Sequence, residues 1–350
     1  MPTPRQTAIP NLVRVKPGAL DRMGIYARRH GLSRVVLLFS VDLSPALIER
    51  MTAVLAAENI RVEQHLPVSS VRFEDTVEIF RRLPPRLSAI IGFGGGKALD
   101  VAKYVAFLAH LPYLAVATSL SNDGICSPQS SLTVENRRRS LPSAMPFGVI
   151  IDTDVCRQAP EHLWLSGVGD LAAKFTAVTD WKLAFHARGE PIDDFAVLLA
   201  DASIYQFLAR PERDLEGIRL LGTSLIMNGI AMSVSGSSRP ASGSEHLISH
   251  ALDTLGERPR LHGLQVGVAT YVISRLQQQN TERIARLFEQ TGFWRFISAD
   301  PFSRSEWIAA ARMAPTLKDS FYTILSARDC VPEIEDLLRS DPLLRDCFVD

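Results

Sequence analysis

Three of the eight histidines in this 350-residue chain lie within seventeen residues of one another, at His246, His250 and His262. His246 and His250 are four residues apart, so they share one face of a predicted helix, and His262 begins the next apolar segment. Neutral imidazoles bind zinc, nickel or ferrous iron, and two packed helices can each present one nitrogen to the same ion. The spacing predicts a metal site, although histidine pairs at this spacing also occur on ordinary helix surfaces and in cores.

An acidic partner for these histidines lies upstream, at Asp170. One carboxylate and two imidazoles leave a bound divalent ion with positive charge and open coordination positions, which is the arrangement of a Lewis-acid site. Lys174 follows one helical turn later on the same face. The alternative for Asp170 is a structural role as a helix N-cap.

A glycine-rich segment, residues 92–97 with the sequence GFGGGK, lies between a predicted buried strand and a predicted helix. Glycines let backbone N–H groups approach a diphosphate closely, and a helix N-terminus adds partial positive charge. The segment therefore predicts a phosphate cradle, with a plain tight turn as the alternative. It differs from the usual dinucleotide fingerprint because it follows a later strand than the first, and from a P-loop because neither Ser nor Thr follows Lys97.

The next loop, residues 117–124, follows the carboxyl end of a predicted strand, which is where ligands bind in open α/β sheets. The hydroxyl groups of Thr118 and Ser119 can contact a phosphate or a carboxamide, and Asp123 can accept a hydrogen bond from a substrate hydroxyl. The alternative is a solvated turn.

Periodicity divides the chain into two predicted domains. In the first part, short apolar runs alternate with helical periods, which is typical of βαβ units and a mostly parallel sheet. Strands are expected at residues 13–15, 35–39, 62–65, 89–91, 113–116 and 149–151, and helices at 17–29, 45–58, 73–83 and 97–110. After Asp154 only helical periodicity continues, and residues 137–139, three arginines, are read as a solvated loop. We expect an α/β dinucleotide-binding domain over residues 1–157 and an all-helical metal- and substrate-binding domain over residues 158–350.

The overall composition excludes several classes of protein. With 38 basic and 38 acidic residues, the chain has no electrostatic field that would recruit nucleic acid or an anionic membrane. No uninterrupted apolar stretch reaches the roughly 18 to 20 residues that a membrane span needs. The start of the chain lacks an apolar signal core, and its four cysteines form no paired framework, so a cytoplasmic protein is expected.

Taken together, the motifs resemble the iron-containing alcohol dehydrogenase and dehydroquinate synthase superfamily, and most closely its sn-glycerol-1-phosphate dehydrogenase branch. The resemblance extends through nearly the whole chain. It is carried by residues 92–106 (GFGGGKALDVAKYVA), 118–132 (TSLSNDGICSPQSSL), 167–184 (GVGDLAAKFTAVTDWKLA), 231–253 (AMSVSGSSRPASGSEHLISHALD) and 262–270 (HGLQVGVAT), with a fainter match at 321–325 (FYTIL).

This resemblance implies an N-terminal dinucleotide-binding domain and a C-terminal helical metal domain, with the active site in the cleft between them. The implied metal ligands are Asp170, His246 and His262, with zinc usual in this branch and nickel or ferrous iron as alternatives. The implied positions for NAD(H) or NADP(H) are Gly94, Gly95, Gly96, Lys97, Asp100, Thr118 and Ser119. The implied substrate-facing and catalytic positions are Asp123, Lys174 and His250, together with Arg239 as a substrate ligand.

Two positions depart from the family pattern. Asn122 stands where the family has histidine, and Leu264 stands where the family has glutamate. These changes remove an imidazole and a carboxylate that could transfer protons, while the three expected metal ligands are retained. They bear on the identity of the substrate and on the route of the proton.

The function implied by the resemblance is reduction of the ketone of a small hydroxyketone. Dihydroxyacetone phosphate giving sn-glycerol 1-phosphate is the first expectation, with a role in phospholipid metabolism. A phosphate group on the substrate suits Arg239, since a guanidinium can hold two phosphate oxygens, although a helix-cap or salt-bridge role is the alternative. A homo-oligomer with no nucleic-acid partner and no membrane span is expected. The alternatives in function are a dehydroquinate-synthase-like cyclase and a non-catalytic nucleotide-binding descendant.

Overall fold

The computed structural model describes residues 7–256, 258, 260–318 and 320–350. The chain forms two compact units, Met1–Ala159 and Pro160–Asp350. Residues 1–6 of the first predicted domain lie outside the described residues.

The first unit is built on a six-stranded parallel sheet with the order β1-β8-β5-β4-β2-β3. Its strands are β1 (Leu12–Lys16), β2 (Arg34–Ser40), β3 (Arg61–Val68), β4 (Ala89–Gly94), β5 (Tyr113–Ala117) and β8 (Gly148–Asp152). Strands β4, β5 and β8 are buried along their whole length because helices cover both faces of the sheet, as parallel sheets require.

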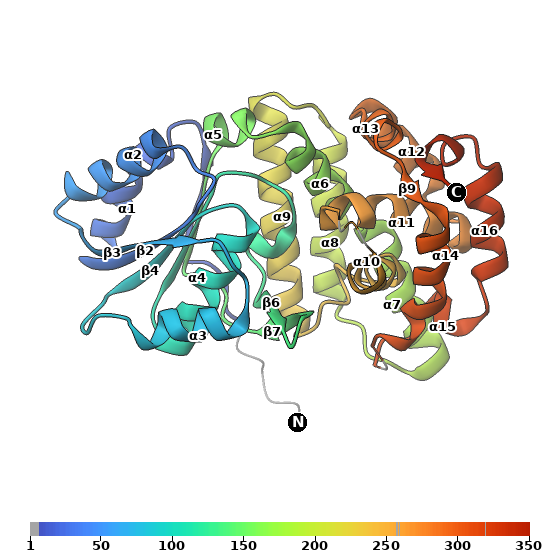
Figure 1. Ribbon diagram of the computed structural model, residues 1–350, viewed down its shortest axis with the longest axis horizontal. Coiled ribbons are helices and arrows are strands. Elements are labelled where there is room, and N and C mark those ends of the chain that lie inside the picture. The colour runs from blue at the N-terminus through green and yellow to red at the C-terminus, as the bar shows by residue number, and fades with distance from the viewer. Residues whose placement is uncertain (1–6, 257, 259, 319) are drawn as a thin grey trace. The chain divides into compact units, whose positions relative to one another are not determined.

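Helices of the first unit lie on the two faces of this sheet, with α1 and α2 on one face and α3 and α4 on the other (Figure 1). Their bounds are α1 (Met23–Arg29), α2 (Pro45–Ala56), α3 (Phe73–Arg81), α4 (Gly96–Ala109) and α5 (Thr153–Gln158), with 3-10 turns η1 (Leu20–Arg22) and η2 (Asp123–Ile125). The predicted elements of this unit are confirmed, except that the segment expected as a helix over residues 17–29 is a 3-10 turn followed by α1.

Arg137, Arg138 and Arg139 were expected in a loop, and this expectation is wrong. They lie in β7 (Arg137–Pro142), which pairs antiparallel with β6 (Gln129–Val134). The three arginine side chains are exposed, as expected. Both turn residues of the hairpin, Glu135 and Asn136, have positive φ angles of 49° and 60°, which is the backbone of a tight two-residue hairpin turn.

The second unit is helical over most of its length, as expected. Its helices are α6 (Glu161–Ala172), α7 (Lys174–Arg188), α8 (Asp194–Leu208), α9 (Leu215–Ser235), α10 (Ser244–Leu255), α11 (His262–Gln277), α12 (Thr281–Gln290), α13 (Phe293–Ala299), α14 (Arg304–Met313), α15 (Ile324–Ala327) and α16 (Val331–Ser340), with 3-10 turns η3 (Ala314–Thr316) and η4 (Arg345–Cys347). The all-helical expectation needs one correction, because β9 (Phe302–Ser303) and β10 (Phe348–Val349) form a short parallel pair.

Helix α9 is, within the described part of the chain, the one helix that is long and apolar enough to cross a membrane. Within its most apolar window, 67% is buried inside the protein, which is typical of a core helix. It packs against α8 and α6.

Candidate metal and dinucleotide sites

Three side chains from three different helices of the second unit converge on one point. Asp170 lies near the end of α6, His246 lies in the first turn of α10, and His262 is the first residue of α11. Their ligand atoms all lie within 4.8 Å of one another. The Nε2 atoms of His246 and His262 lie 3.5 Å and 3.8 Å from Oδ1 of Asp170. The three ligands predicted from the sequence are therefore adjacent in space.

Glycines at the contact between α6 and α11 make this approach possible. A Cβ atom added at Gly169 would lie 2.0 Å from the carbonyl oxygen of Gly263, and one added at Gly263 would lie 1.9 Å from the carbonyl oxygen of Ser166. Any side chain at either position would force the two helix backbones apart. Because each glycine is next to a predicted ligand, this contact sets the separation of Asp170 and His262.

Glu245 holds the ring of His246 from the side opposite Asp170. Nδ1 of His246 lies 2.8 Å from Oε1 of the fully buried Glu245, whose carboxylate also accepts from the Thr176 hydroxyl at 2.8 Å and from the Gly243 N–H at 2.6 Å. A carboxylate can only accept, so Nδ1 of His246 carries the proton. Nε2 then faces Asp170 and is the nitrogen left to bind a metal ion, as in carboxylate–histidine–metal arrangements.

His262 is oriented by a second chain of hydrogen bonds. The Ser249 hydroxyl donates to Oε1 of Gln265 at 2.8 Å, and the Ser249 oxygen lies 3.0 Å from Nδ1 of His262. Because the only hydroxyl hydrogen of Ser249 is used by Gln265, Nδ1 of His262 must be the donor. Nε2 of this imidazole also keeps its lone pair for the point shared with Asp170.

Buried charge around the three side chains favours a cation. Burial raises the pKa of the Asp170 carboxyl, but the Lys174 ammonium and the hydrogen bond from His246 outweigh this effect and hold the pKa well below its usual range. Burial lowers the pKa of His246, but its hydrogen bonds to Asp170 and Glu245 prevail and raise the pKa to about 9. The carboxylates of Asp170 and Glu245 thus stabilise the protonated, positively charged imidazole of His246. They would stabilise a bound divalent ion for the same electrostatic reason. The donor set therefore fits zinc or another divalent ion of similar preference.

The remaining predicted residues of the second unit lie in two different places. His250 is beside the triad, with its ring centroid 5.7 Å from that of His262. Lys174 is fully buried, and its ammonium donates to the carbonyl oxygens of Asp170 and Ala241, both at 3.1 Å. This geometry indicates that Lys174 fixes the end of α6 and the charge of Asp170, and direct contact with substrate stays a prediction.

Arg239 is engaged by other groups of the protein. Its guanidinium forms a two-pronged ion pair with Glu190, donates to the carbonyl oxygens of Tyr322 and Ser320, and lies 4.0 Å above the ring of Phe321. These contacts favour the structural role that the sequence left open. Binding of a phosphate by Arg239 stays a prediction, and it requires Glu190 to share the guanidinium.

In the first unit the glycine-rich segment forms the turn from β4 to α4. Gly94 has a φ of 143° and an added Cβ atom would lie 2.1 Å from the Ser40 hydroxyl oxygen, so the fold itself requires glycine there. Cβ atoms added at Gly95 and Gly96 would meet nothing closer than 3.4 Å and 3.7 Å. The space that their missing side chains leave is therefore available to a ligand at the N-terminus of α4, as a dinucleotide diphosphate requires.

The hydroxyl-bearing loop adjoins this turn at the same edge of the sheet. Gly94 pairs with Ala117, and the Thr118 N–H donates to the Gly94 carbonyl oxygen at 3.1 Å. Thr118 and Ser119 are buried beside the turn, and Lys97 is exposed in the first turn of α4. The predicted cofactor residues are thus brought together. Their role in binding NAD(P) stays a prediction.

Lys103 holds the second half of this loop and was not predicted. Its fully buried ammonium donates to the carbonyl oxygens of Gly124 and Gln129, both at 2.7 Å, and lies 3.4 Å from Oδ1 of Asp100. Burial raises the pKa of Asp100 although Lys103 opposes it. Asn122 closes the turn, since its side-chain oxygen accepts the Gly124 N–H at 2.9 Å. The residue that departs from the family pattern therefore has a structural use here.

Comparison with known proteins shows the family to which the chain belongs. The chain is 34% identical over 338 residues to the curated glycerol-1-phosphate dehydrogenase (NAD(P)+) of Aeropyrum pernix, with 94% of this chain and 96% of the relative covered. The enzyme of the same name from Methanothermobacter thermautotrophicus is also 34% identical, over 96% of this chain and 97% of the relative. This chain belongs to the glycerol-1-phosphate dehydrogenase family. The family sequence model described as iron-containing alcohol dehydrogenase matches residues 14–160.

Solved structures confirm the fold of this glycerol-1-phosphate dehydrogenase family member. A glycerol dehydrogenase from Schizosaccharomyces pombe matches with a TM-score of 0.78 at 17% identity, covering 99% of this chain and 92% of that chain. An iron-containing alcohol dehydrogenase from Thermotoga maritima matches with a TM-score of 0.70 at 17% identity, covering 95% of this chain and 98% of that chain. The protein is an NAD(P)-dependent enzyme of the alcohol dehydrogenase type.

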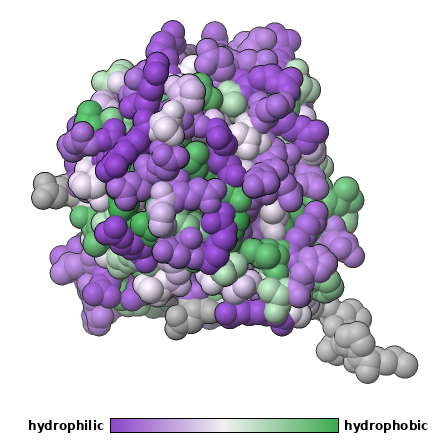
Figure 2. All heavy atoms as spheres, turned by 90° about the vertical axis from the view of Figure 1, so that its right-hand side faces the viewer, coloured by the Kyte–Doolittle hydropathy of each residue, from purple (hydrophilic) through white to green (hydrophobic). Residues whose placement is uncertain are grey.

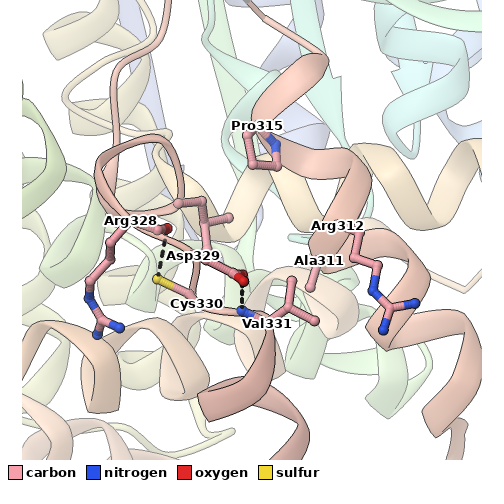
Figure 3. A pocket seen from close by; sticks show the side chains of 8 residues that line it. Ala311, Arg312, Pro315, Arg328, Asp329, Cys330 and Val331 are labelled. Atoms are coloured by element: carbon pink, nitrogen blue, oxygen red, sulfur yellow. Dashed lines mark hydrogen bonds between the residues drawn. The ribbon is translucent and has the colours of Figure 1, made fainter.

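Two cavities of this family member lie apart from the predicted site residues. One, of about 190 Å³ in the second unit, has Arg312 and Arg328 on opposite sides, with the Cys330 thiol hydrogen-bonded to the Arg328 carbonyl between them (Figure 3). The other, of about 320 Å³ in the first unit, is lined by Phe80 of α3, Ala109 of α4 and residues of the loops that follow these two helices. Neither includes a residue predicted to bind metal, cofactor or substrate.

The surface on the side of α14 and α16 is mostly hydrophilic, with hydrophobic residues in small separate patches (Figure 2).

Glu245→Gln is expected to weaken zinc binding by about 10- to 100-fold, which is the usual effect of losing a partner of a metal-ligating histidine. The amide that replaces one carboxylate oxygen faces donors at Thr176, Gly243 and His246, so at least one hydrogen bond is lost. Zinc affinity is measured by competition with a chelator. The matched control is Glu289→Gln, an exposed position on α12. Equal zinc affinity in Glu245→Gln and wild type would show that Glu245 does not act through His246.

Proposed function

We propose that this protein is a divalent-metal-dependent NAD(P)H oxidoreductase that reduces the ketone of a small hydroxyketone, with dihydroxyacetone phosphate and sn-glycerol 1-phosphate as its substrate pair. The observation that carries the proposal is the triad Asp170, His246 and His262, of which the first two are buried and in which both imidazoles are held with Nε2 toward the carboxylate. The relatives named above act, by their names, on glycerol 1-phosphate with NAD(P)+.

Each group of residues has a distinct part in the proposed reaction. A zinc ion held by the triad would supply Lewis-acid polarisation of the ketone, and NAD(P)H would supply the hydride. The N–H group of Gly96 would bind the cofactor diphosphate, with Thr118 and Ser119 beside it. The Gly95 N–H donates to the Ser40 hydroxyl at 3.1 Å, so Gly95 would contribute by leaving the space that the diphosphate needs.

In the second unit, Glu245 and Ser249 accept a hydrogen bond from Nδ1 of each ligand imidazole, which leaves Nε2 to bind the ion. His250 would donate the proton that completes the alcohol, and Asp123 would accept a hydrogen bond from a substrate hydroxyl. We also propose a cytoplasmic homo-oligomer that supplies glycerol phosphate to phospholipid metabolism.

The experiment that tests this proposal follows nicotinamide oxidation by the zinc-loaded protein. Dihydroxyacetone phosphate and unphosphorylated dihydroxyacetone are each assayed with NADH and NADPH, and the reverse reaction is assayed with sn-glycerol 1-phosphate and sn-glycerol 3-phosphate. We expect turnover of the phosphorylated ketone and selective oxidation of the 1-phosphate. Turnover of the plain ketone alone would reassign the substrate, while cofactor binding with no turnover of any hydroxyketone would contradict the enzymatic proposal.

Gly95→Val is expected to raise the Kd for NAD(P)H at least about tenfold, because a branched side chain would occupy the space where a diphosphate must approach the backbone. The fold should tolerate the change, since the nearest atom to an added Cβ is the Ser119 hydroxyl oxygen at 3.4 Å. Cofactor binding is measured by nicotinamide fluorescence titration, with thermal stability and zinc content as controls for folding. Wild-type cofactor affinity in a folded Gly95→Val protein would show that the turn is not the diphosphate site.

A further inference from the structure

A second cluster of metal-ligating side chains adjoins the triad in the second unit. His250, Asp253 and His262 each offer one ligand atom, and these atoms all lie within 4.8 Å of one another. His250 and Asp253 are three residues apart on α10, so they share one helical face, and His262 begins α11. The donor set is again one carboxylate and two imidazoles, so this outer cluster suits the same divalent ions as the triad.

The two clusters share His262. Its ring centroid lies 5.1 Å from that of His246 and 5.7 Å from that of His250. Since Nδ1 of His262 donates to Ser249, only Nε2 can bind a metal ion, and one lone pair serves one ion at a time. The inner and outer clusters are therefore alternative positions for an ion held by His262.

The two clusters differ in burial. Asp170 is 1% exposed and His246 is 7% exposed, whereas none of the three outer side chains is buried. An ion bound at the triad must pass from the exposed region to the buried one, because a buried metal site needs a route from solvent. Along α10, His246, His250 and Asp253 follow one another at intervals of four and three residues, so the ligands of the two clusters form a continuous row from the interior to the surface.

We propose that His250, Asp253 and His262 form an outer divalent-cation site through which the ion reaches and leaves the inner triad. The ion would exchange Asp253 and His250 for Asp170 and His246 while His262 holds it throughout. This inference rests on the proposed function only in taking the inner triad as the resident metal site. Because the outer ligands are less buried than Asp170 and His246, the outer site binds more weakly and exchanges faster than the inner one.

The rates of metal loading and release test the proposal. Metal-free wild type and Asp253→Asn are mixed with Co²⁺, and loading is followed by the visible absorption of the bound ion; release is followed after adding a chelator. We expect Asp253→Asn to slow both processes by about tenfold or more, with little change in the Kd at equilibrium. The Kd is the ratio of the release rate constant to the loading rate constant, so equal slowing of both leaves the Kd unchanged. This result would indicate that an exchange route, and not a ligand of the inner triad, has been lost. The matched control is Asp194→Asn, which removes one exposed carboxylate elsewhere in the same unit and should load and release at wild-type rates.

A second measurement isolates the outer site at equilibrium. His246→Ala disables the inner triad but keeps all three outer ligands, so it should retain one weakly bound Co²⁺ ion whose affinity falls again by about tenfold when Asp253→Asn is added. Wild-type loading and release rates in Asp253→Asn, or no effect of that change in the His246→Ala background, would overturn the outer site alone. A wild-type chain that binds no divalent ion at equilibrium would overturn the inner triad and the outer site together.

Discussion

Replacement of His246 by alanine is expected to raise the Kd for zinc by at least about 100-fold, because the loss exceeds the 10- to 100-fold effect of removing an outer partner. Asp170 and His262 would be left as two ligands that cannot close a tight site. Glu245, fully buried, would lose the donor that Nδ1 of His246 supplies. Turnover of the hydroxyketone should fall about 1,000-fold or more, since Lewis-acid polarisation is worth several kcal/mol of transition-state stabilisation.

Zinc content by elemental analysis and kcat/KM on dihydroxyacetone phosphate check this expectation. The matched control is His186→Ala, which removes an exposed histidine from α7 of the same unit and should keep wild-type zinc content and activity. Cofactor binding should be unchanged in both variants. A His246→Ala protein that still carries one tightly bound zinc ion and turns over at the wild-type rate would contradict the assignment of the triad.

The sequence is most informative where one stretch of chain contains the whole feature. The run of buried apolar residues in β4, the glycines after it and the periodicity of α4 are all local, so the strand–turn–helix unit was predicted with close bounds. The β6–β7 hairpin was missed because its turn residues are Glu135 and Asn136, whereas the usual tight-turn signal is Asn-Gly or Asp-Gly. An exposed run of arginines carries no alternation of apolar and polar residues to indicate a strand.

In the candidate metal site, too, the features contained in one stretch of chain were predicted and those that depend on packing were not. The histidine spacing along α10 was readable from the sequence, and Asp170 was predicted as the acidic ligand from its charge and from the family resemblance. The orienting residues Glu245, Ser249 and Gln265 could not be assigned, because their roles depend on which side chain meets which ring nitrogen after the helices pack. For Glu245, direct adjacency to His246 was an available signal. Lys103 gave no signal, since a lysine in a helix is ordinarily exposed.

A Gly→Ala change at the contact between α6 and α11 is expected to have opposite effects on helix propensity and on helix packing. Within a helix, Gly→Ala ordinarily gains up to about 1 kcal/mol. At Gly169 the added Cβ atom would lie 2.0 Å from a backbone oxygen of Gly263, which cannot move aside by changing a rotamer. We expect Gly169→Ala to reduce the free energy of unfolding by about 3 kcal/mol or more, at the upper end of the usual effect of overpacking, and to lower zinc affinity at least about tenfold because Asp170 and His262 move apart.

Denaturant unfolding and chelator competition measure the two effects in the same protein. The matched control is Gly96→Ala, at the first position of α4, where the atom nearest to the added Cβ is Nδ2 of Asn122 at 3.7 Å, so its stability and zinc affinity should equal those of wild type. A stable Gly169→Ala protein with wild-type zinc affinity would show that α6 and α11 can separate without disturbing the ligands. Loss of stability and of zinc affinity in Gly169→Ala, with neither loss in Gly96→Ala, would show that the glycines hold Asp170 and His262 within reach of one ion.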